Sequence, residues 1–389
     1  MKTGLVLSGG GARGAYQVGV LKAVADLHPK HAPNPFSIIS GTSAGAINAV
    51  AMASSANNFR LGVKKTEKIW ANLGVNDVVR ARGVDLLSNS ARLALSLFNR
   101  GISRGKPLGL LNNDPLRDLL SHVIRYNNIQ KRIDAGLLEA VSVTATSYAT
   151  GNSVTFFQGQ PHIKRWHRGK RIGVPAQLTV EHLLGSTAIP SVFPAEKIGR
   201  QYFGDGSVRQ LAPLSPTLKL GADKILVIGV RGHSSSRIST RRDHAPSVAQ
   251  TLGHIFNSAF IDSLEGDLSN LQRVNELLGA LANEAPALVE GIMVNDAIVK
   301  PIDLLVIRPS IDFDAIASDH VSDLPAGLRR VLRAMGAGGK SGGGSLASYL
   351  LFEADFCREL IYHGYRDTMA VKDEVQRFFG LEQSPLQTA

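Results

Sequence analysis

The stretch VLSGGGARGAYQVGVLKA, residues 6–23, joins an apolar run to a helical pattern through three consecutive glycines, Gly9 to Gly11. The flanking residues predict a strand over Thr3–Leu7 and a helix over Ala12–Leu27. The spacing Gly-x-Gly-x-x-Gly, which ends at Gly14, is that of a dinucleotide-binding fingerprint. Such a loop either binds the phosphates of a nucleotide through its backbone N–H groups or stabilises a different anion.

The second predicted strand separates these two functions. A dinucleotide site needs an acidic residue at the end of that strand to hold the ribose hydroxyls. Instead, the buried run FSIIS, residues 36–40, continues into GTSAG, and Asp26 lies within the first predicted helix. A P-loop around Lys340 is also excluded, because Ala334 stands where its first glycine is required. We therefore predict no nucleotide site.

The pentapeptide Gly41-Thr42-Ser43-Ala44-Gly45 has the pattern of a nucleophile elbow between a strand and a helix. In such an elbow the serine occupies a sharp turn, and the two glycines relieve crowding by their neighbours. The turn exposes the Ser43 hydroxyl at the carboxyl end of the sheet and at the N-terminus of a helix predicted over Ala44–Ala53. We predict that Ser43 is a nucleophile.

The glycine loop then has a different task. Acyl transfer requires N–H donors aimed at the oxyanion of the tetrahedral intermediate. One donor is expected from Ala44, and the others from a loop at the end of a neighbouring strand. Glycines allow the backbone of that loop to approach the substrate closely. Because strand 3–7 is expected beside the second strand, the Gly9–Gly11 loop would face Ser43.

A serine nucleophile also needs a base. The histidines that follow residue 205 lie in no recognisable motif; they are His233, His244, His254, His320 and His363. The most prominent downstream acid is Asp205 in QYFGDGSVRQLAP, where a short strand over Gln201–Phe203 would present the carboxylate at the tip of a Gly-Asp-Gly turn. An ordinary Asp-Gly turn is the alternative for this segment alone.

Together, these segments resemble the patatin-like phospholipase family, in particular its bacterial branch. The resemblance rests on GGGARG from Gly9, GTSAG around Ser43 and DGS at Asp205, with support from GSTAIPSVFP, residues 185–194. These blocks span about half of the chain, and the bacterial members also resemble it as far as LIYHGYRDTMA, residues 360–370.

The resemblance implies a serine lipid acyl hydrolase with a Ser-Asp dyad and no catalytic histidine. Ser43 would be the nucleophile and Asp205 the base, while the N–H groups of Gly10, Gly11 and Ala44 would form the oxyanion hole. The remaining motif residues are Gly9, Arg13, Gly14, Gly41, Thr42, Gly45, Gly206 and Ser207. For Arg13 a structural salt bridge is expected over contact with a lipid headgroup. Ser207 departs from the family, which has Gly or Ala there.

The alternation of short apolar runs with helical patterns, together with the resemblance, predicts a three-layer α/β/α fold with a mostly parallel central sheet. We expect a catalytic core over residues 3–222 and, over 223–389, an α/β-to-helical extension with a glycine-rich loop at 336–345. Further elements are predicted as strands at 139–147, 153–159, 224–230 and 304–310 and as helices at 178–186, 246–283 and 348–379.

Composition narrows the setting. Hydrophobic residues make up 44% and charged residues 19% of the 389 residues, which is typical of a globular enzyme. The single cysteine, Cys357, excludes an intrachain disulfide. No signal peptide or membrane-spanning run is recognised, so we expect a cytoplasmic protein that contacts the membrane only peripherally. No cofactor or metal site is expected, because DFDAIASDH at 312–320 lacks the glycine and terminal glutamate of a calcium loop.

The net charge of +11 favours anionic partners. The densest cluster, Lys164–Arg171, is expected to be a solvated loop, and nothing around it indicates nucleic-acid binding. The segment from Arg80 to Lys106 has the pattern of an amphipathic basic helix, which would dock on the core or act as a lid at anionic lipid. The expected substrate is a phospholipid or lysophospholipid. The alternatives are a thioesterase, a triglyceride lipase, an acyltransferase, or a catalytically weak lipid-binding module.

Overall fold

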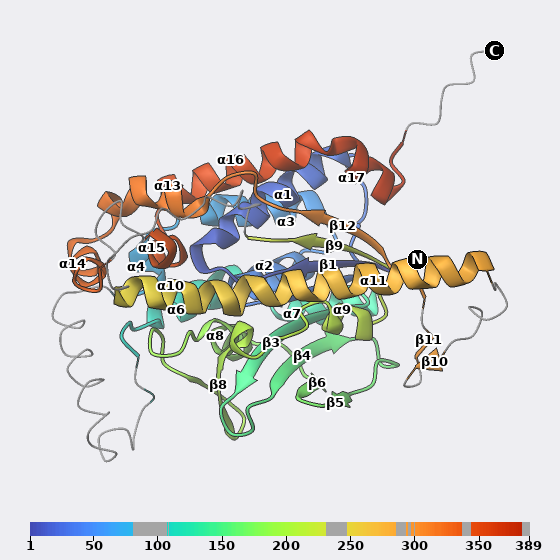
Figure 1. Cartoon of the computed structure of the whole chain (residues 1–389), viewed down its shortest axis with the longest axis horizontal. Helices are drawn as coiled ribbons and strands as arrows, with labels where there is room; N and C mark the ends of the chain where they lie inside the picture. Colours follow the sequence, from blue (N-terminus) through green and yellow to red (C-terminus); the bar gives the residue numbers. More distant parts are fainter. Residues whose placement is uncertain are drawn as a thin grey trace, which may run out of the picture.

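The computed structural model describes residues 1–80, 107, 109–230, 247–284, 293–294, 297–298, 300–336 and 344–382. Within these residues the centre is a ten-stranded sheet with the order β12-β9-β1-β2-β3-β4-β6-β5, and a β7-β8 hairpin joins it beside β3 (Figure 1). The strands are β1 (Thr3–Leu7), β2 (Ile38–Thr42), β3 (Ala140–Ser147), β4 (Ser153–Gly159), β5 (Trp166–Arg168), β6 (Arg171–Pro175), β7 (Glu196–Ile198), β8 (Gln201–Asp205), β9 (Lys224–Ile228) and β12 (Asp303–Ile307). A separate hairpin pairs β10 (Met293–Val294) with β11 (Ala297–Ile298).

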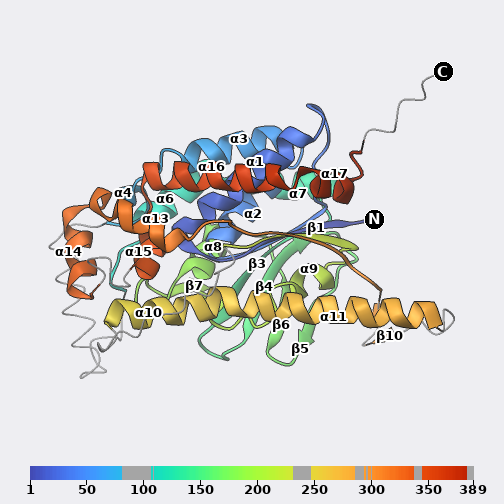
Figure 2. The same ribbon diagram turned by 45° about the horizontal axis from the view of Figure 1, so that its top comes forward.

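Helices cover both faces of this sheet, which gives the three-layer α/β/α fold (Figures 1 and 2). Side chains alternate along each strand, so Leu5 and Leu7 pack into one apolar cluster while Val6 packs into another. The helices are α1 (Gly14–Leu27), α2 (Ala44–Ser54), α3 (Phe59–Trp70), α4 (Val75–Val78), α6 (Asp114–Val123), α7 (Asn127–Asp134), α8 (Val180–Thr187), α9 (Ser215–Lys219), α10 (Val248–Asn257), α11 (Ser263–Glu284), α13 (Phe313–His320), α14 (Ala326–Ala334), α15 (Gly344–Leu350), α16 (Ala354–Ala370) and α17 (Lys372–Phe379).

The strands at the centre of the sheet run parallel. β1 pairs in parallel with β2 on one side and with β9 on the other, and β2 pairs in parallel with β3. The expected mostly parallel sheet is therefore confirmed at its centre, and β4 and β8 join β3 antiparallel. Because the carboxyl ends of β1 and β2 lie at the same edge, the loops that follow Leu7 and Thr42 meet there.

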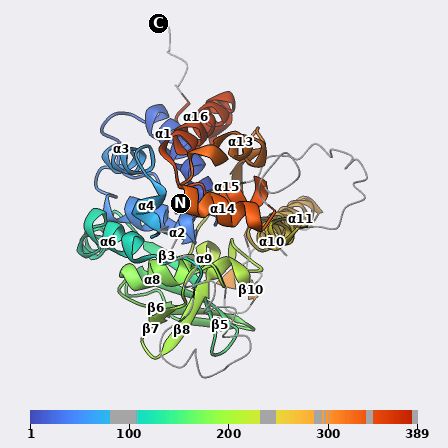
Figure 3. The same cartoon turned by 90° about the vertical axis from the view of Figure 1, so that its left-hand side faces the viewer.

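The C-terminal segment packs onto the first helix of the chain. α16 lies beside α1 in both side views, and glycines allow the close approach (Figures 1 and 3). A Cβ at Gly19 would lie 2.0 Å from the Ile361 carbonyl oxygen, and one at Gly364 would lie 2.2 Å from that of Tyr16. The Tyr16 hydroxyl also donates to Asp367 at 3.1 Å. The predicted helical tail is present as α15, α16 and α17, and the first of them begins at Gly344, inside the predicted glycine-rich loop.

The helix predicted over residues 246–283 is one continuous helical run. α10 passes through a π-helical turn at Ser258–Asp262 into α11, which forms the long helix along one side of the molecule (Figure 1). The π-turn shifts the helical phase by one residue between the two halves. The sequence pattern was therefore sufficient to predict the run, but not its interruption.

The basic cluster Lys164–Arg171 differs from its prediction. It is not a loop, because Trp166–Arg168 forms β5, which pairs antiparallel with β6 at the edge of the sheet. Trp166 anchors this hairpin by stacking on Phe157, with ring centroids 5.0 Å apart. The charged side chains from Lys164 to Lys170 are exposed, as is typical of an edge strand.

Some predictions lie outside the described residues. These are the basic segment from residue 81 to Lys106, residues 337–343 of the glycine-rich loop, and the histidines His233 and His244.

Candidate active site

Ser43 occupies the turn between β2 and α2 that the sequence predicts. Its backbone has φ 55° and ψ −128°, a strained conformation for a residue with a side chain. The two flanking glycines are sterically required. A Cβ at Gly41 would lie 2.3 Å from the Gly45 carbonyl oxygen, and one at Gly45 would lie 2.2 Å from that of Leu7. The turn is therefore tightly packed, and Ser43 is buried, with 2% of the residue exposed.

The hydroxyl of Ser43 donates a hydrogen bond to Asp205, with Oγ and Oδ2 2.6 Å apart. The other carboxylate oxygen, Oδ1, accepts from the backbone N–H of Ser207 at 2.9 Å. The prediction that the carboxylate lies at a loop tip is wrong, because β8 extends through Asp205, which is 0% exposed. The strand that carries it extends to residue 205 and pairs with β3, so the carboxylate lies inside the sheet edge rather than beyond it.

Burial raises the pKa of Asp205 to about 6, and the hydrogen bonds from Ser43 and Ser207 oppose this shift. The cause is the loss of solvation of the charged form. A carboxylate with a pKa nearer to neutrality is a stronger base than an ordinary aspartate, and it remains ionised above pH 6.

Ser186 of α8 binds the backbone next to the Ser43 side chain. Its hydroxyl accepts from the backbone N–H of Ser43 at 2.9 Å and donates to the Thr144 carbonyl at 2.6 Å. Two residues later, the carbonyl of Ala188 accepts from the N–H of Asp205 at 2.8 Å. The segment 185–194 therefore holds the backbone at both residues. The sequence singled out this segment only through the resemblance and assigned no role to Ser186.

Three backbone N–H groups were predicted to form the oxyanion hole. Those of Gly10, Gly11 and Ala44 have no hydrogen-bond acceptor among the described residues. Gly11 and Ala44 line the same cavity as Ser43. Gly11 has φ 57°, and a Cβ there would lie 2.2 Å from the Tyr349 carbonyl oxygen, so only glycine fits.

The other motif residues pack around these groups. Gly14 begins α1, where a Cβ would lie 3.1 Å from that of Ala44. A Cβ at Gly206 would lie 2.1 Å from the Thr144 carbonyl oxygen, which explains the glycine after Asp205. The hydroxyl of Thr42 donates to Gln210 at 2.6 Å. A small cavity of mixed polar and apolar lining is bordered by Gly9, Thr42, Ser207 and Gln210, among other residues.

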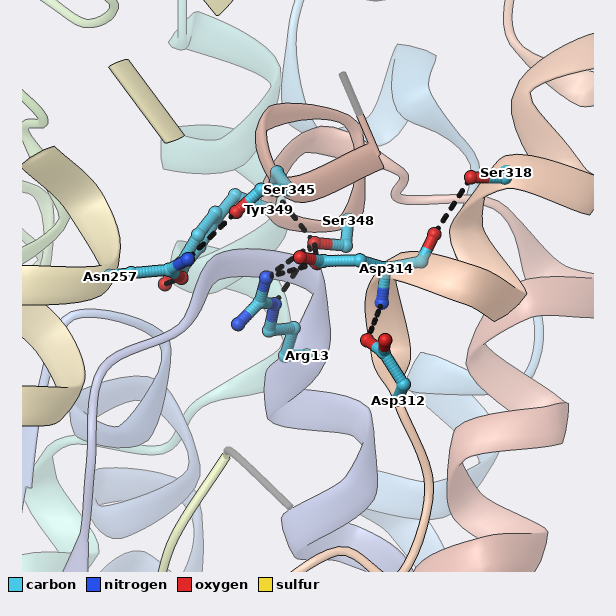
Figure 4. Close-up of polar contacts among 8 residues, drawn as sticks. All are labelled: Arg13, Asn257, Asp312, Asp314, Ser318, Ser345, Ser348 and Tyr349. Carbon is cyan, nitrogen blue, oxygen red and sulfur yellow. Dashed lines mark hydrogen bonds and ion pairs between the residues drawn. The ribbon is translucent and has the colours of Figure 1, made fainter. Parts of the chain in front are cut away.

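Arg13 is buried and paired, as the salt-bridge prediction expected. Only 4% of its side chain is exposed, and Nη2 lies 2.6 Å from Asp314 Oδ1 on α13. Nε and Nη2 also donate to the Ser348 hydroxyl on α15, at 3.0 and 2.7 Å (Figure 4). The guanidinium lies 4.0 Å from the centre of the Tyr349 ring. The glycine block is thereby fastened to two helices of the C-terminal segment.

The residues on α13 and α15 were not predicted from the sequence. Asp314 is 301 positions from Arg13, and no motif surrounds Ser348 or Tyr349. The hydroxyl of Tyr349 donates to Asn257 of α10 at 3.0 Å, which ties α15 to a third helix (Figure 4). The only signal in the sequence was Arg13 itself, a single charged residue in a loop of glycines and alanines.

An apolar cavity, partly open to solvent, begins at Ser43. Aliphatic and aromatic side chains from α2, α3, α6 and the C-terminal segment form most of its wall: Ile47, Ala51, Ile69, Trp70, Leu73, Val78, Leu116, Leu119, Leu120, Val123, Ile124, Ile189, Phe193, Tyr349 and Phe352. Such a cavity suits a hydrocarbon chain rather than a polar substrate.

The described histidines have other environments. His320 pairs with Asp323 and Glu359, and His182 is buried, which lowers its pKa to about 4. Among the described residues, no histidine forms a hydrogen bond with Ser43 or Asp205. In the same part of the chain, no three His, Cys, Asp or Glu side chains are grouped to hold a metal ion. None of the described helices is long and apolar enough to span a membrane.

Comparisons with known proteins identify the family of this chain. The model of the patatin-like phospholipase family matches residues 5–218. Among solved structures, the crystal structure of VipD from Legionella pneumophila is similar over 96% of this chain and 67% of that chain, with 14% sequence identity and a TM-score of 0.35. No protein with a curated description matches the sequence. Since the family match covers more than half of the chain and includes the glycine loop, the Ser43 elbow and Asp205, this protein belongs to the patatin-like phospholipase family of lipid acyl hydrolases.

Proposed function

We propose that this protein hydrolyses fatty acyl esters of phospholipids or lysophospholipids through an acyl-Ser43 intermediate. The observation that carries the proposal is the 2.6 Å hydrogen bond from Ser43 to a buried Asp205, at the mouth of an apolar cavity. A nucleophile, its base and a site for the acyl chain are then in contact with one another.

In the acylation step, Ser43 Oγ attacks the carbonyl carbon of the ester while its proton passes to Asp205 Oδ2. The oxyanion that forms accepts hydrogen bonds from the N–H groups of Gly10, Gly11 and Ala44. The carbon–oxygen bond to the alcohol then breaks, and the alcohol leaves with the proton from Asp205. The products of this step are acyl-Ser43 and a free lysolipid or glycerophosphoryl alcohol.

Deacylation repeats the sequence with water. Asp205 accepts a proton from the water molecule as its oxygen attacks the acyl carbon, and the proton then returns to Ser43 as the fatty acid leaves. The dyad has no imidazole, so the base must itself be close to neutrality in its pKa. The value of about 6 for Asp205 meets this requirement.

The test is labelling with a fluorophosphonate followed by a lipid panel. We expect the probe to modify Ser43 and the S43A variant to be unlabelled, while purified protein releases fatty acid from phospholipids or lysophospholipids without added metal. Faster release from acyl-CoA or triglyceride would favour the thioesterase or lipase alternative. Acyl transfer to an added alcohol in preference to water would favour the acyltransferase. Failure of the probe to label the wild-type protein would favour the remaining alternative, a catalytically weak lipid-binding module.

We further propose that contact with anionic membranes is transient and electrostatic. The net charge of +11 and the exposed basic hairpin at Lys164–Arg171 support this. Flotation with liposomes containing phosphatidylserine should increase over neutral liposomes and fall as salt rises. Equal flotation with both lipids would contradict it.

A further inference from the structure

The apolar cavity follows α2 for the whole length of that helix. The residues of α2 and its C-cap that line it are Ala44, Ile47, Ala51, Ser54 and Ser55. Spacings of three and four residues place them on one face of the helix, one turn above another. The cavity is therefore elongated along the helix axis and begins next to Ser43, the residue that caps α2.

A second helix, α3, runs antiparallel to α2 along the same cavity. At the end near Ser43, a Cβ at Gly14 would contact both Ala44 and the Trp70 ring, so the last residue of α3 lies beside the first residue of α2. At the other end, a Cβ at Gly62 would lie 2.8 Å from that of Ser55. These two contacts show that α2 and α3 approach each other closely at both ends of the cavity.

The chemical character of the lining changes along this axis. The middle is aliphatic, with Ile47 and Ala51 of α2 in its wall, and the Trp70 ring lies nearer the Ser43 end. At the far end the lining includes Ser54 and Ser55, where α3 approaches α2 closely at Gly62. An acyl chain gains binding energy only while its methylenes contact the apolar middle section, because the polar far end offers no dry surface.

The helix provides a scale for the length of that section. With a rise of about 1.5 Å per residue, Ile47, Ala51 and Ser55 lie about 6, 12 and 18 Å from Ser43 along α2. An extended hydrocarbon chain advances about 1.25 Å for each carbon–carbon bond. These positions therefore correspond to roughly the fifth, tenth and fourteenth carbon of a chain attached to Ser43.

We propose that a single acyl chain lies extended along α2 and that the cavity selects its length, with full contact up to about fourteen carbons. This inference rests on the proposed acyl transfer at Ser43, and it adds the chain class of the substrate. Up to that length each additional methylene should raise kcat/KM by up to about fourfold, and beyond it the gain should stop.

The test places bulky side chains at successive turns of the helix. Wild-type protein and the variants I47W, A51F and S55F are assayed on monoacyl lysophospholipids or p-nitrophenyl esters from C4 to C18. The chain length at which kcat/KM stops rising should be about five carbons for I47W, about ten for A51F and about fourteen for S55F. For A51F, the kcat/KM ratio of C14 to C10 substrate should fall by up to about 250-fold.

Leu61 supplies a matched control. It lies on α3, 46% exposed and outside the cavity lining, so L61F adds a ring nearby without blocking the chain. Its chain-length profile should match that of wild type. Where A51F fails to fold, as judged by its Tm, the smaller A51L variant should still shift the limit toward shorter chains.

The outcomes separate this inference from the proposed function. Loss of the ordered limits, with Ser43 still labelled by fluorophosphonate and esters still cleaved, would overturn the length selection alone. Absence of labelling and of cleavage in wild type would overturn the acyl-transfer proposal itself. A limit that shifts with L61F as much as with A51F would also contradict the placement of the chain along α2.

Discussion

The segment matched by the family model and the C-terminal segment contribute to the candidate site in different ways. Residues 5–218 supply Ser43, Asp205 and the glycine loop. The segment beyond them supplies none of these groups, yet Asp314 and Ser348 bind Arg13 within the glycine block. The proposed reacting groups thus lie within the first 205 residues, whereas the groups that hold the glycine block in place lie beyond residue 310.

The two regions therefore differ in the kind of residue that they contribute: the first contributes reacting groups as proposed, and the second contributes groups that hold a loop in position. Reacting groups must be particular residue types at fixed local spacing, so they form short motifs. A group that only holds a loop needs a suitable charge and volume at the right place, and any part of the chain can supply it. The proposed boundary after residue 222 also runs within one sheet, because β9 and β12 from the later segment complete it.

The largest expected effect comes from the first region. S43A and D205N should each lower ester hydrolysis by about a thousandfold or more, because they remove the nucleophile and the base. Both should remain folded, with a circular dichroism spectrum and a cooperative thermal transition like those of wild type. Near-normal activity of S43A would end the assignment. An active D205N together with an inactive histidine variant would indicate a conventional triad instead.

A smaller but substantial effect is expected from the second region. D314A leaves the buried Arg13 guanidinium without its carboxylate, so the glycine loop should lose its fixed position. We expect kcat to fall about ten- to a hundredfold with little change in KM. The free energy of unfolding should fall by about 2 kcal/mol, less than for a fully buried pair, because 35% of the Asp314 side chain is exposed to solvent. The R13K variant should also lose activity, although it keeps the positive charge, because a lysine cannot bind Ser348 and Asp314 with a planar fork.

The ion pair between Arg308 and Glu265 is the control for this experiment. It is partly exposed and lies outside the candidate site, so R308Q should change stability by less than about 1 kcal/mol and leave the kinetics unaltered. If D314A lowers stability without lowering kcat, the contact is structural and the extension has no part in positioning the loop.

The pH profile tests the base directly. Asp205 accepts a proton only when it is ionised, and burial raises its pKa to about 6. Activity should therefore fall about tenfold for each unit of pH below 6 and level off above it, as measured by kcat/KM on a neutral ester. A limb near pH 4, the ordinary range of an aspartate, would show that Asp205 is more solvated than in this structure.

The smallest effect concerns the residue that departs from the family pattern. The backbone N–H and the hydroxyl of Ser207 both donate hydrogen bonds that lower the pKa of Asp205. S207A keeps the first bond and removes the second, so the acidic limb should move to higher pH by less than one unit. S207G serves as the comparison with the other common family residue. A limb that moves to lower pH would contradict the role of the hydroxyl.

Much of the fold around the candidate site could be predicted from local sequence. The strand and helix around GGGARG and the sharp turn at Ser43 follow from residue types at short spacing, whereas Asp205 was assigned its role only through the family resemblance. The burial of Asp205 could not be predicted, because it depends on the pairing of β8 with β3. Nor could the position of Trp166 in an edge strand, where a stacked partner and backbone pairing outweigh the surrounding charges.

The sequence by itself determined which groups are available for reaction, since glycine at a crowded turn and a serine between strand and helix have local physical causes. Only the tertiary structure decided how those groups are held and what they face. The contact between Arg13 and Asp314 joins residues 301 positions apart, and the apolar cavity exists only where several helices pack together. Interactions of that kind depend on position in space, and many different sequences can satisfy them.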